Sequence, residues 1–221
     1  MATDDRPVID YYSDMLCVWA WIAQPRLEEV RERWGSRIVI RERFIDVFGA
    51  AHEKILKQWG DADGFERFGS HVLEAGAAHP HAQLHEGLWK SVRPQGSWSA
   101  HLWVKAAALA GDETDGARLA AAIRRAFFVD GRDISDTAVL DEVAQSLDLD
   151  ADALSAALGT GQALAALAAD LKAAQAAHVH GSPTWVMNQG RQVLYGNVGY
   201  RIIDANLKEF LDGEPGGASW C

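Results

Sequence analysis

The order of strand and helix patterns along the chain is the feature that most constrains its fold. A strand pattern at 8–12 leads into a helix that starts near Cys17 and ends near Gly35, and a second strand pattern covers 37–45. Two strands joined by a crossover helix form a parallel pair with a right-handed connection. Further on, strand patterns at 184–187 and 192–195 flank a turn and predict an antiparallel hairpin, followed by a helix at 200–211.

The segment between these halves, from about residue 50 to 177, is rich in alanine and has helical periodicity. Helices are expected at 52–60, 64–75, 100–110, 116–128, 137–147, 152–158 and 162–177. Asp136 and Asp150 are predicted N-caps, and Pro25 is expected to kink the first helix. The chain is therefore predicted to be an α/β protein with a split sheet domain (1–48 and 180–213), an all-helical insertion (49–179) and a flexible tail (214–221).

Composition excludes several classes of protein. A formal net charge of −10 argues against a nucleic-acid surface, and 48% hydrophobic residues with nine tryptophans suffice for a packed core. No stretch is long enough to span a membrane, and the first residues lack the apolar region of a secretory signal. Two cysteines cannot form a disulfide framework. These observations predict a chain without a membrane partner, in the reducing environment of the cytoplasm.

Cys17 lies where the first strand gives way to the first helix. Unpaired N–H groups and the dipole at a helix N-terminus stabilise a thiolate, so this residue is a candidate nucleophile; the alternative is a buried structural cysteine. A dithiol motif would place a second cysteine at Ala20. The other cysteine is Cys221, and the ten residues beyond Leu211 extend about 33–36 Å, enough to reach Cys17. Cys221 is thus a candidate resolving thiol, or an exposed tail thiol without a role.

Three stretches carry a resemblance to a known family: Asp14–Ala20 (DMLCVWA), Phe128–Asp136 (FVDGRDISD) and Gly181–Trp185 (GSPTW). Together they resemble the DsbA-like family of the thioredoxin fold, which includes 2-hydroxychromene-2-carboxylate isomerases and kappa-class glutathione transferases. The resemblance covers nearly the whole chain. It implies a thioredoxin fold (βαβ…ββα) with a large helical insertion, and a cis proline, Pro183, that faces the thiol.

The departure from the family pattern shapes the expected chemistry. Dithiol members carry C-x-x-C, whereas this chain has Cys17-Val18-Trp19-Ala20, and the isomerase and transferase branch commonly has serine at the position of Cys17. The resemblance therefore implies a thiol–disulfide oxidoreductase that uses Cys17 as its single nucleophile, with glutathione or Cys221 resolving the intermediate. Glutathione is the expected co-substrate and no covalent cofactor is expected. A small-molecule thiol or disulfide, or a protein disulfide, is the expected substrate.

Other residues are candidates for substrate binding. Ser182, next to Pro183, would pair its backbone with a peptide or glutathione as an added strand, and Trp19 would shape the substrate surface. His180 is a candidate to support the Cys17 thiolate, although a histidine that binds strand-end backbone is the alternative. A set of three nearby histidines lacks a cysteine or carboxylate partner, so no metal site is predicted; they are His79, His81 and His85.

Two other functions stay open at this point. In a glutathione-dependent isomerase or transferase, Cys17 would bind or activate glutathione and the helical insertion would hold an aromatic substrate. In a non-catalytic binding module, the same groove would serve only to bind partners. The sequence leaves open the direction of electron flow and the oligomeric state, a homodimer included.

Overall fold

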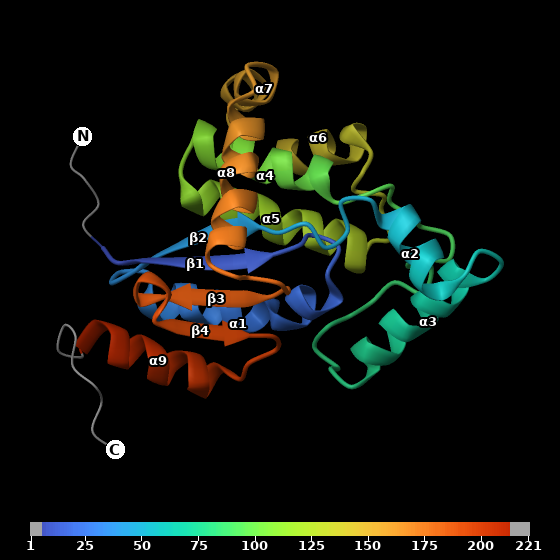
Figure 1. Ribbon diagram of the computed structural model, residues 1–221. Helices are drawn as coiled ribbons and strands as arrows, with labels where there is room; N and C mark the ends of the chain where they lie inside the picture. The colour runs from blue at the N-terminus through green and yellow to red at the C-terminus, as the bar shows by residue number, and fades with distance from the viewer. Residues whose placement is uncertain (1–5, 213–221) are drawn as a thin grey trace.

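A mixed four-stranded sheet lies at the centre of the computed structural model, which describes residues 6–212 (Figure 1). Its strands are β1 (Val8–Ser13), β2 (Val39–Phe44), β3 (Thr184–Met187) and β4 (Gln192–Tyr195), in the order β2-β1-β3-β4. β1 and β2 are parallel, and β3 is antiparallel to both β1 and β4. This topology confirms the predicted parallel pair and hairpin. The expected tail with Cys221 lies outside the described residues.

Helices α1 (Val18–Trp34) and α9 (Tyr200–Asp212) pack against the sheet through one hydrophobic cluster. Alternate residues of a strand point to opposite faces, so Ile9 and Tyr11 join this cluster while Tyr12 packs in a different one. Helix α1 runs uninterrupted through Pro25. Burial of these apolar side chains is what holds the two helices on the sheet.

The expected helices of the insertion are all present, and their ends lie within three residues of the expected ones. They are α2 (Ala51–Trp59), α3 (Gly64–Ala77), α4 (Trp98–Ala110), α5 (Glu113–Phe128), α6 (Thr137–Gln145), α7 (Ala151–Gly159) and α8 (Gln162–Ala176). The side chains of Asp136 and Asp150 cap α6 and α7 as predicted. Helix α5 begins three residues early because Asp112 accepts the backbone N–H groups of Thr114 and Asp115.

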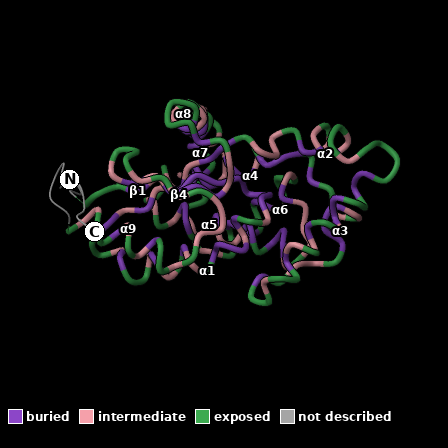
Figure 2. Tube along the Cα trace, turned by 60° about the horizontal axis from the view of Figure 1, so that its bottom comes forward, coloured by how far each residue is buried: buried purple, intermediate pink, exposed green. Residues whose placement is uncertain are grey.

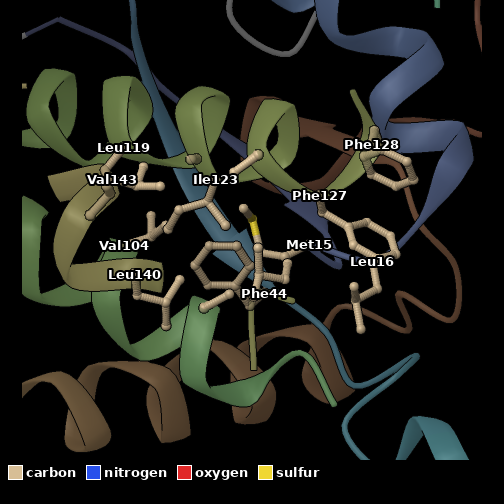
Figure 3. Close-up of a cluster of buried hydrophobic side chains, with 14 of the residues drawn as sticks. Met15, Leu16, Phe44, Val104, Leu119, Ile123, Phe127, Phe128, Leu140 and Val143 are labelled. Atoms are coloured by element: carbon tan, nitrogen blue, oxygen red, sulfur yellow. The ribbon is translucent and has the colours of Figure 1, made fainter. Parts of the chain in front are cut away.

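The insertion has its own large hydrophobic core, which includes Met15 and Leu16 from the sheet domain (Figure 3). Figure 2 shows buried chain through the middle of the molecule and exposed chain around its rim. Within residues 6–212 no single helix is long and apolar enough to cross a membrane. The helix pair α7 and α8, which is bent by 66° at the break between them, could cross a membrane by length and composition only.

Two buried ionic contacts join the insertion to β2. Arg124 of α5 is fully buried and lies 3.4 Å from the Glu42 carboxylate, measured from Nη2 to Oε2. Asp170 of α8 forms ion pairs with Arg43 at 2.7 Å and Lys105 at 2.8 Å, and it accepts the backbone N–H of Phe44. Charges this deeply buried need partners, so these pairs fix how the insertion sits on the sheet.

Candidate active site

Cys17 is the N-cap residue of α1, and its position is fixed from both sides. Its N–H donates to the Asp14 carbonyl at 3.1 Å, which closes the turn that leaves β1. Its own carbonyl accepts the N–H groups of Ala20 and Trp21. The two preceding side chains, Met15 and Leu16, are buried in the core of the insertion (Figure 3). The sulfur is therefore held at the start of the helix, as the sequence predicted.

The loop before β3 lies directly against this turn. The Ser182–Pro183 peptide bond is cis. The Cys17 thiol donates to the Ser182 carbonyl, with 3.3 Å between sulfur and oxygen, and the Ser182 hydroxyl accepts the Asp14 N–H at 3.0 Å. The structure thus brings together two segments that are 165 residues apart in the chain.

The thiol is more buried than its place at a helix start suggested. Cys17 is only 6% exposed, and this burial raises the pKa of its thiol above the ordinary value. Interactions with Ser182 and with the Ala20 backbone oppose that effect, and the negative charge of Asp14 adds to it. The expectation of a stabilised thiolate is therefore wrong for the substrate-free protein: the helix N-terminus does not outweigh desolvation.

Alkylation of Cys17 is expected to depend on pH in a way that reveals this burial. Because only the thiolate reacts, a raised pKa means that the rate with iodoacetamide keeps rising as the pH passes 9. The measurement is the rate of Cys17 modification between pH 6 and 11, followed by peptide mapping. A rate that reaches its plateau near neutral pH would contradict the raised pKa.

A cavity of about 240 Å³ opens beside the sulfur. It is lined by Leu16, Cys17, Val18, Trp19, Val47, Phe48, Phe68, Val72, His180, Gly181, Ser182 and Tyr195. Three of the predicted binding residues, Trp19, His180 and Ser182, therefore share one cavity with Cys17. None of these lining side chains is a Lys, Arg, Asp or Glu. The walls suit the apolar part of a substrate.

The cavity has further lining residues that sequence reasoning missed. Phe68 and Val72 lie on α3, and Phe48 lies in the loop before α2. The spacing of Phe68 and Val72, four residues apart, marks one face of a helix, but it does not show which site that face meets. Tyr195 at the end of β4 is 70% exposed and also lines the cavity.

The histidine set of residues 79–85 has structural contacts. A ring nitrogen of His81 lies 3.0 Å from the Ile22 carbonyl, and His85 accepts the Gly87 N–H. Across the part of the chain that the structure describes, no three His, Cys, Asp or Glu side chains are grouped so that they could hold a metal ion. The predicted role of His180 toward the thiolate stays a prediction.

Solved structures of similar fold cover nearly the whole chain. A candidate protein disulfide isomerase from Nitrosomonas europaea has a TM-score of 0.72 at 20% identity, over 94% of this chain and 97% of that one. The cytosolic disulfide reductase DsbM from Pseudomonas aeruginosa, solved with GSH, has a TM-score of 0.68 at 23% identity, over 91% of this chain and 99% of that one. A 2-hydroxychromene-2-carboxylate isomerase has a TM-score of 0.64 at 19% identity, over 91% of this chain and 95% of that one. At these identities the likeness establishes the fold.

The family assignment comes from the sequence match. No curated protein matches the chain. The family model described as "DSBA-like thioredoxin domain" matches residues 8–208, which run from the first strand into the last helix. The matched range contains the Cys17 turn, the insertion and the prolyl loop, the segments that build the cavity. The chain therefore belongs to the DSBA-like thioredoxin domain family.

Proposed function

We propose that this protein is a thiol–disulfide oxidoreductase with Cys17 as its single active-site nucleophile. The observation that carries the proposal is the contact of the Cys17 sulfur with the Ser182 carbonyl at 3.3 Å, at the wall of an apolar cavity. Thiol–disulfide exchange needs a nucleophilic sulfur, a surface that aligns the disulfide, and room for the group that it carries. The Cys17 turn, the prolyl loop and the cavity supply these in one place.

The proposed cycle has two exchange steps on a glutathione mixed disulfide, R–S–S–G. The Cys17 thiolate attacks the glutathione sulfur, so that a Cys17–glutathione disulfide forms, the substrate S–S bond breaks, and R–S⁻ leaves and takes up a proton. A second glutathione, as thiolate, attacks the glutathione sulfur on Cys17. Oxidised glutathione leaves and Cys17 returns as thiolate. In the net reaction, R–S–S–G and one glutathione thiol give R–SH and oxidised glutathione: the R sulfur is reduced to a thiol and the sulfur of the second glutathione is oxidised to the disulfide level.

The prolyl loop has two tasks in this proposal. First, the Ser182 carbonyl accepts a hydrogen bond from the Cys17 thiol. Second, the backbone of Ser182 offers an edge to which an extended substrate would add as a strand. A substrate N–H that donates to the same carbonyl oxygen makes it a weaker acceptor for the thiol. Substrate binding on this edge would therefore weaken the hydrogen bond between the Cys17 thiol and the prolyl loop.

Glutathione is the proposed co-substrate because the position of a neighbouring resolving cysteine is held by Ala20, which is fully buried. The reductase DsbM, which has the same fold, was solved with GSH. Cys221 is the proposed alternative resolving thiol and lies outside the described residues. Glutathione is abundant in reducing compartments, so we propose a cytoplasmic reaction on a small-molecule or protein disulfide.

The test is whether the folded protein takes up glutathione at Cys17. We expect that full-length Cys221→Ser protein, treated with oxidised glutathione at pH 8, carries one glutathione on Cys17 and loses it to reduced glutathione. Peptide mapping without reductant is the measurement. If Cys17 is modified only after denaturation, the proposal fails.

A glutathione-dependent isomerase is the second candidate, and the cavity is the observation that favours it. Phe48, Phe68 and Val72 form an apolar wall on the insertion side, which suits an aromatic substrate. In that case the protein would bind glutathione beside Cys17 without turning over a mixed disulfide. Calorimetric binding of glutathione together with absent turnover of a glutathionylated peptide would select this function.

A further inference from the structure

Asp14 is a fully buried acidic residue three positions before Cys17. Its Oδ1 accepts the Leu16 N–H at 2.9 Å. Its Oδ2 accepts the N–H groups of Val47 at 3.1 Å and Phe48 at 2.9 Å, and the Ser97 hydroxyl at 2.9 Å. Four donors that converge on two oxygens match an ionised carboxylate, which is an acceptor only. Burial raises the pKa of the Asp14 carboxyl above its ordinary value, and the hydrogen bonds from Leu16, Phe48, Ser97 and Val47 oppose that rise because they favour the ionised form.

The backbone of the same residue completes a junction around the thiol. The Asp14 N–H donates to the Ser182 hydroxyl at 3.0 Å, and the Asp14 carbonyl accepts the Cys17 N–H at 3.1 Å. One residue therefore contacts the Cys17 turn, the prolyl loop, the Val47–Phe48 segment and the residue before α4. Three of these four segments line the cavity.

We infer that Asp14 is the positioning residue of the thiol site, holding the Cys17 turn, the prolyl loop and the Val47–Phe48 wall in one arrangement and placing a fixed negative charge near the sulfur. The inference rests on the proposed function for its effect on turnover. The effect of Asp14 on the pKa of the Cys17 thiol does not depend on which reaction the thiol performs.

Three other titratable residues lie near Asp14 and Cys17, and two of them are neutral at working pH. His101 of α4 has Nε2 4.0 Å from Asp14 Oδ2 and accepts the Met15 N–H; burial lowers its pKa to about 3, so it is neutral at working pH. Tyr11 of β1 has a pKa raised by burial and is neutral too. His180 faces the cavity from the prolyl loop. The negative charge of Asp14 is among the causes that raise the pKa of Cys17, after desolvation by burial.

The variant Asp14→Asn removes the charge and one acceptor. An amide has one acceptor oxygen, so either the Leu16 N–H or the group of donors at Oδ2 loses its partner. We expect the pH midpoint of Cys17 alkylation to fall by about one unit, because a nearby like charge disfavours the thiolate. We expect kcat/KM for a glutathionylated peptide to fall about tenfold, mainly through KM, because the cavity wall and prolyl loop lose their common anchor.

The matched control is Asp170→Asn, since Asp170 is also buried and accepts a backbone N–H and two cationic donors, but from β2 and α4. We expect this control to lose thermal stability and to keep the alkylation midpoint. An Asp14→Asn protein that folds and has the wild-type midpoint and KM would overturn the inference. If wild-type protein shows no turnover, the proposed function fails while the alkylation midpoint still tests Asp14.

A second variant keeps the inference testable if Asp14→Asn does not fold. Ser97→Ala removes one donor to Oδ2 and keeps the charge. We expect its KM to rise about threefold, at the low end for loss of a hydrogen bond because three other donors still hold the carboxylate, while the alkylation midpoint does not fall. An unchanged KM in this variant would overturn the positioning role.

Discussion

Cys17→Ser is expected to lower turnover of a glutathionylated peptide by at least about a thousandfold, because a serine hydroxyl does not ionise near neutral pH and cannot form a mixed disulfide. The residue is 6% exposed and its replacement differs by one atom, so folding should be preserved. The measurement is kcat/KM with reduced glutathione present, together with the melting temperature. Turnover within tenfold of wild type would show that the reaction does not use this sulfur.

The resolving group is decided by a parallel experiment on Cys221→Ser. If glutathione resolves the intermediate, turnover of this variant should depend on glutathione concentration as in the wild-type protein. If Cys221 resolves it, the variant should accumulate the Cys17 mixed disulfide and lose turnover at low glutathione. Asp150→Asn is the control for effects of substitution in general: it alters only the exposed N-cap of α7 and should leave turnover unchanged.

Sequence periodicity sufficed for the order and extent of most elements, because each amphipathic helix and each alternating strand buries one face. The start of α5 was missed because its signal is a single cap, Asp112, placed before a charged first turn. The parallel pairing of β1 with β2 and the hairpin of β3 with β4 followed from the connections between them.

The site was only partly predictable for a different reason. Cys17, Ser182 and Pro183 could be named because they sit in short motifs, but burial is a property of packing. A helix N-terminus predicts a stabilised thiolate only if water reaches it, and the prolyl loop and the insertion cover this one. Asp14 lay inside the quoted motif, yet its partners Val47, Phe48 and Ser97 come from segments that only the fold brings together.

The buried contact between α5 and β2 leads to the largest expected change in stability. Arg124 has no exposed surface, and its guanidinium reaches Ser13 Oγ at 2.7 Å, Gln24 Oε1 at 3.1 Å and Glu42 Oε2 at 3.4 Å. Arg124→Met is expected to reduce the free energy of unfolding by about 3–5 kcal/mol, because Glu42 stays buried with Arg31 as its remaining cationic partner. Urea unfolding at pH 7 is the measurement.

The pH dependence of this loss has a definite sign. Burial alone would raise the pKa of Glu42, but Arg124 and Arg31 hold it below its ordinary value of 4.5. A carboxyl group with a lowered pKa contributes stability above that ordinary value, and the contribution is lost as the pH falls through the folded-state pKa. Without Arg124 the pKa of Glu42 rises. The difference in free energy of unfolding between wild type and Arg124→Met should therefore be largest at neutral pH and should become smaller below about pH 4.5.

Two further variants separate the buried charge from the packing of α5. Adding Glu42→Gln to Arg124→Met should recover part of the lost stability, because the fully buried carboxylate is then neutral and the cation that loses its partner, Arg31, is partly exposed to water. Arg118→Met lies on the same helix but pairs with Asp115 at the surface, and it should change stability by no more than about 0.5 kcal/mol. If Arg124→Met costs no more than Arg118→Met, the charges between α5 and β2 contribute nothing to the attachment of the insertion to the sheet.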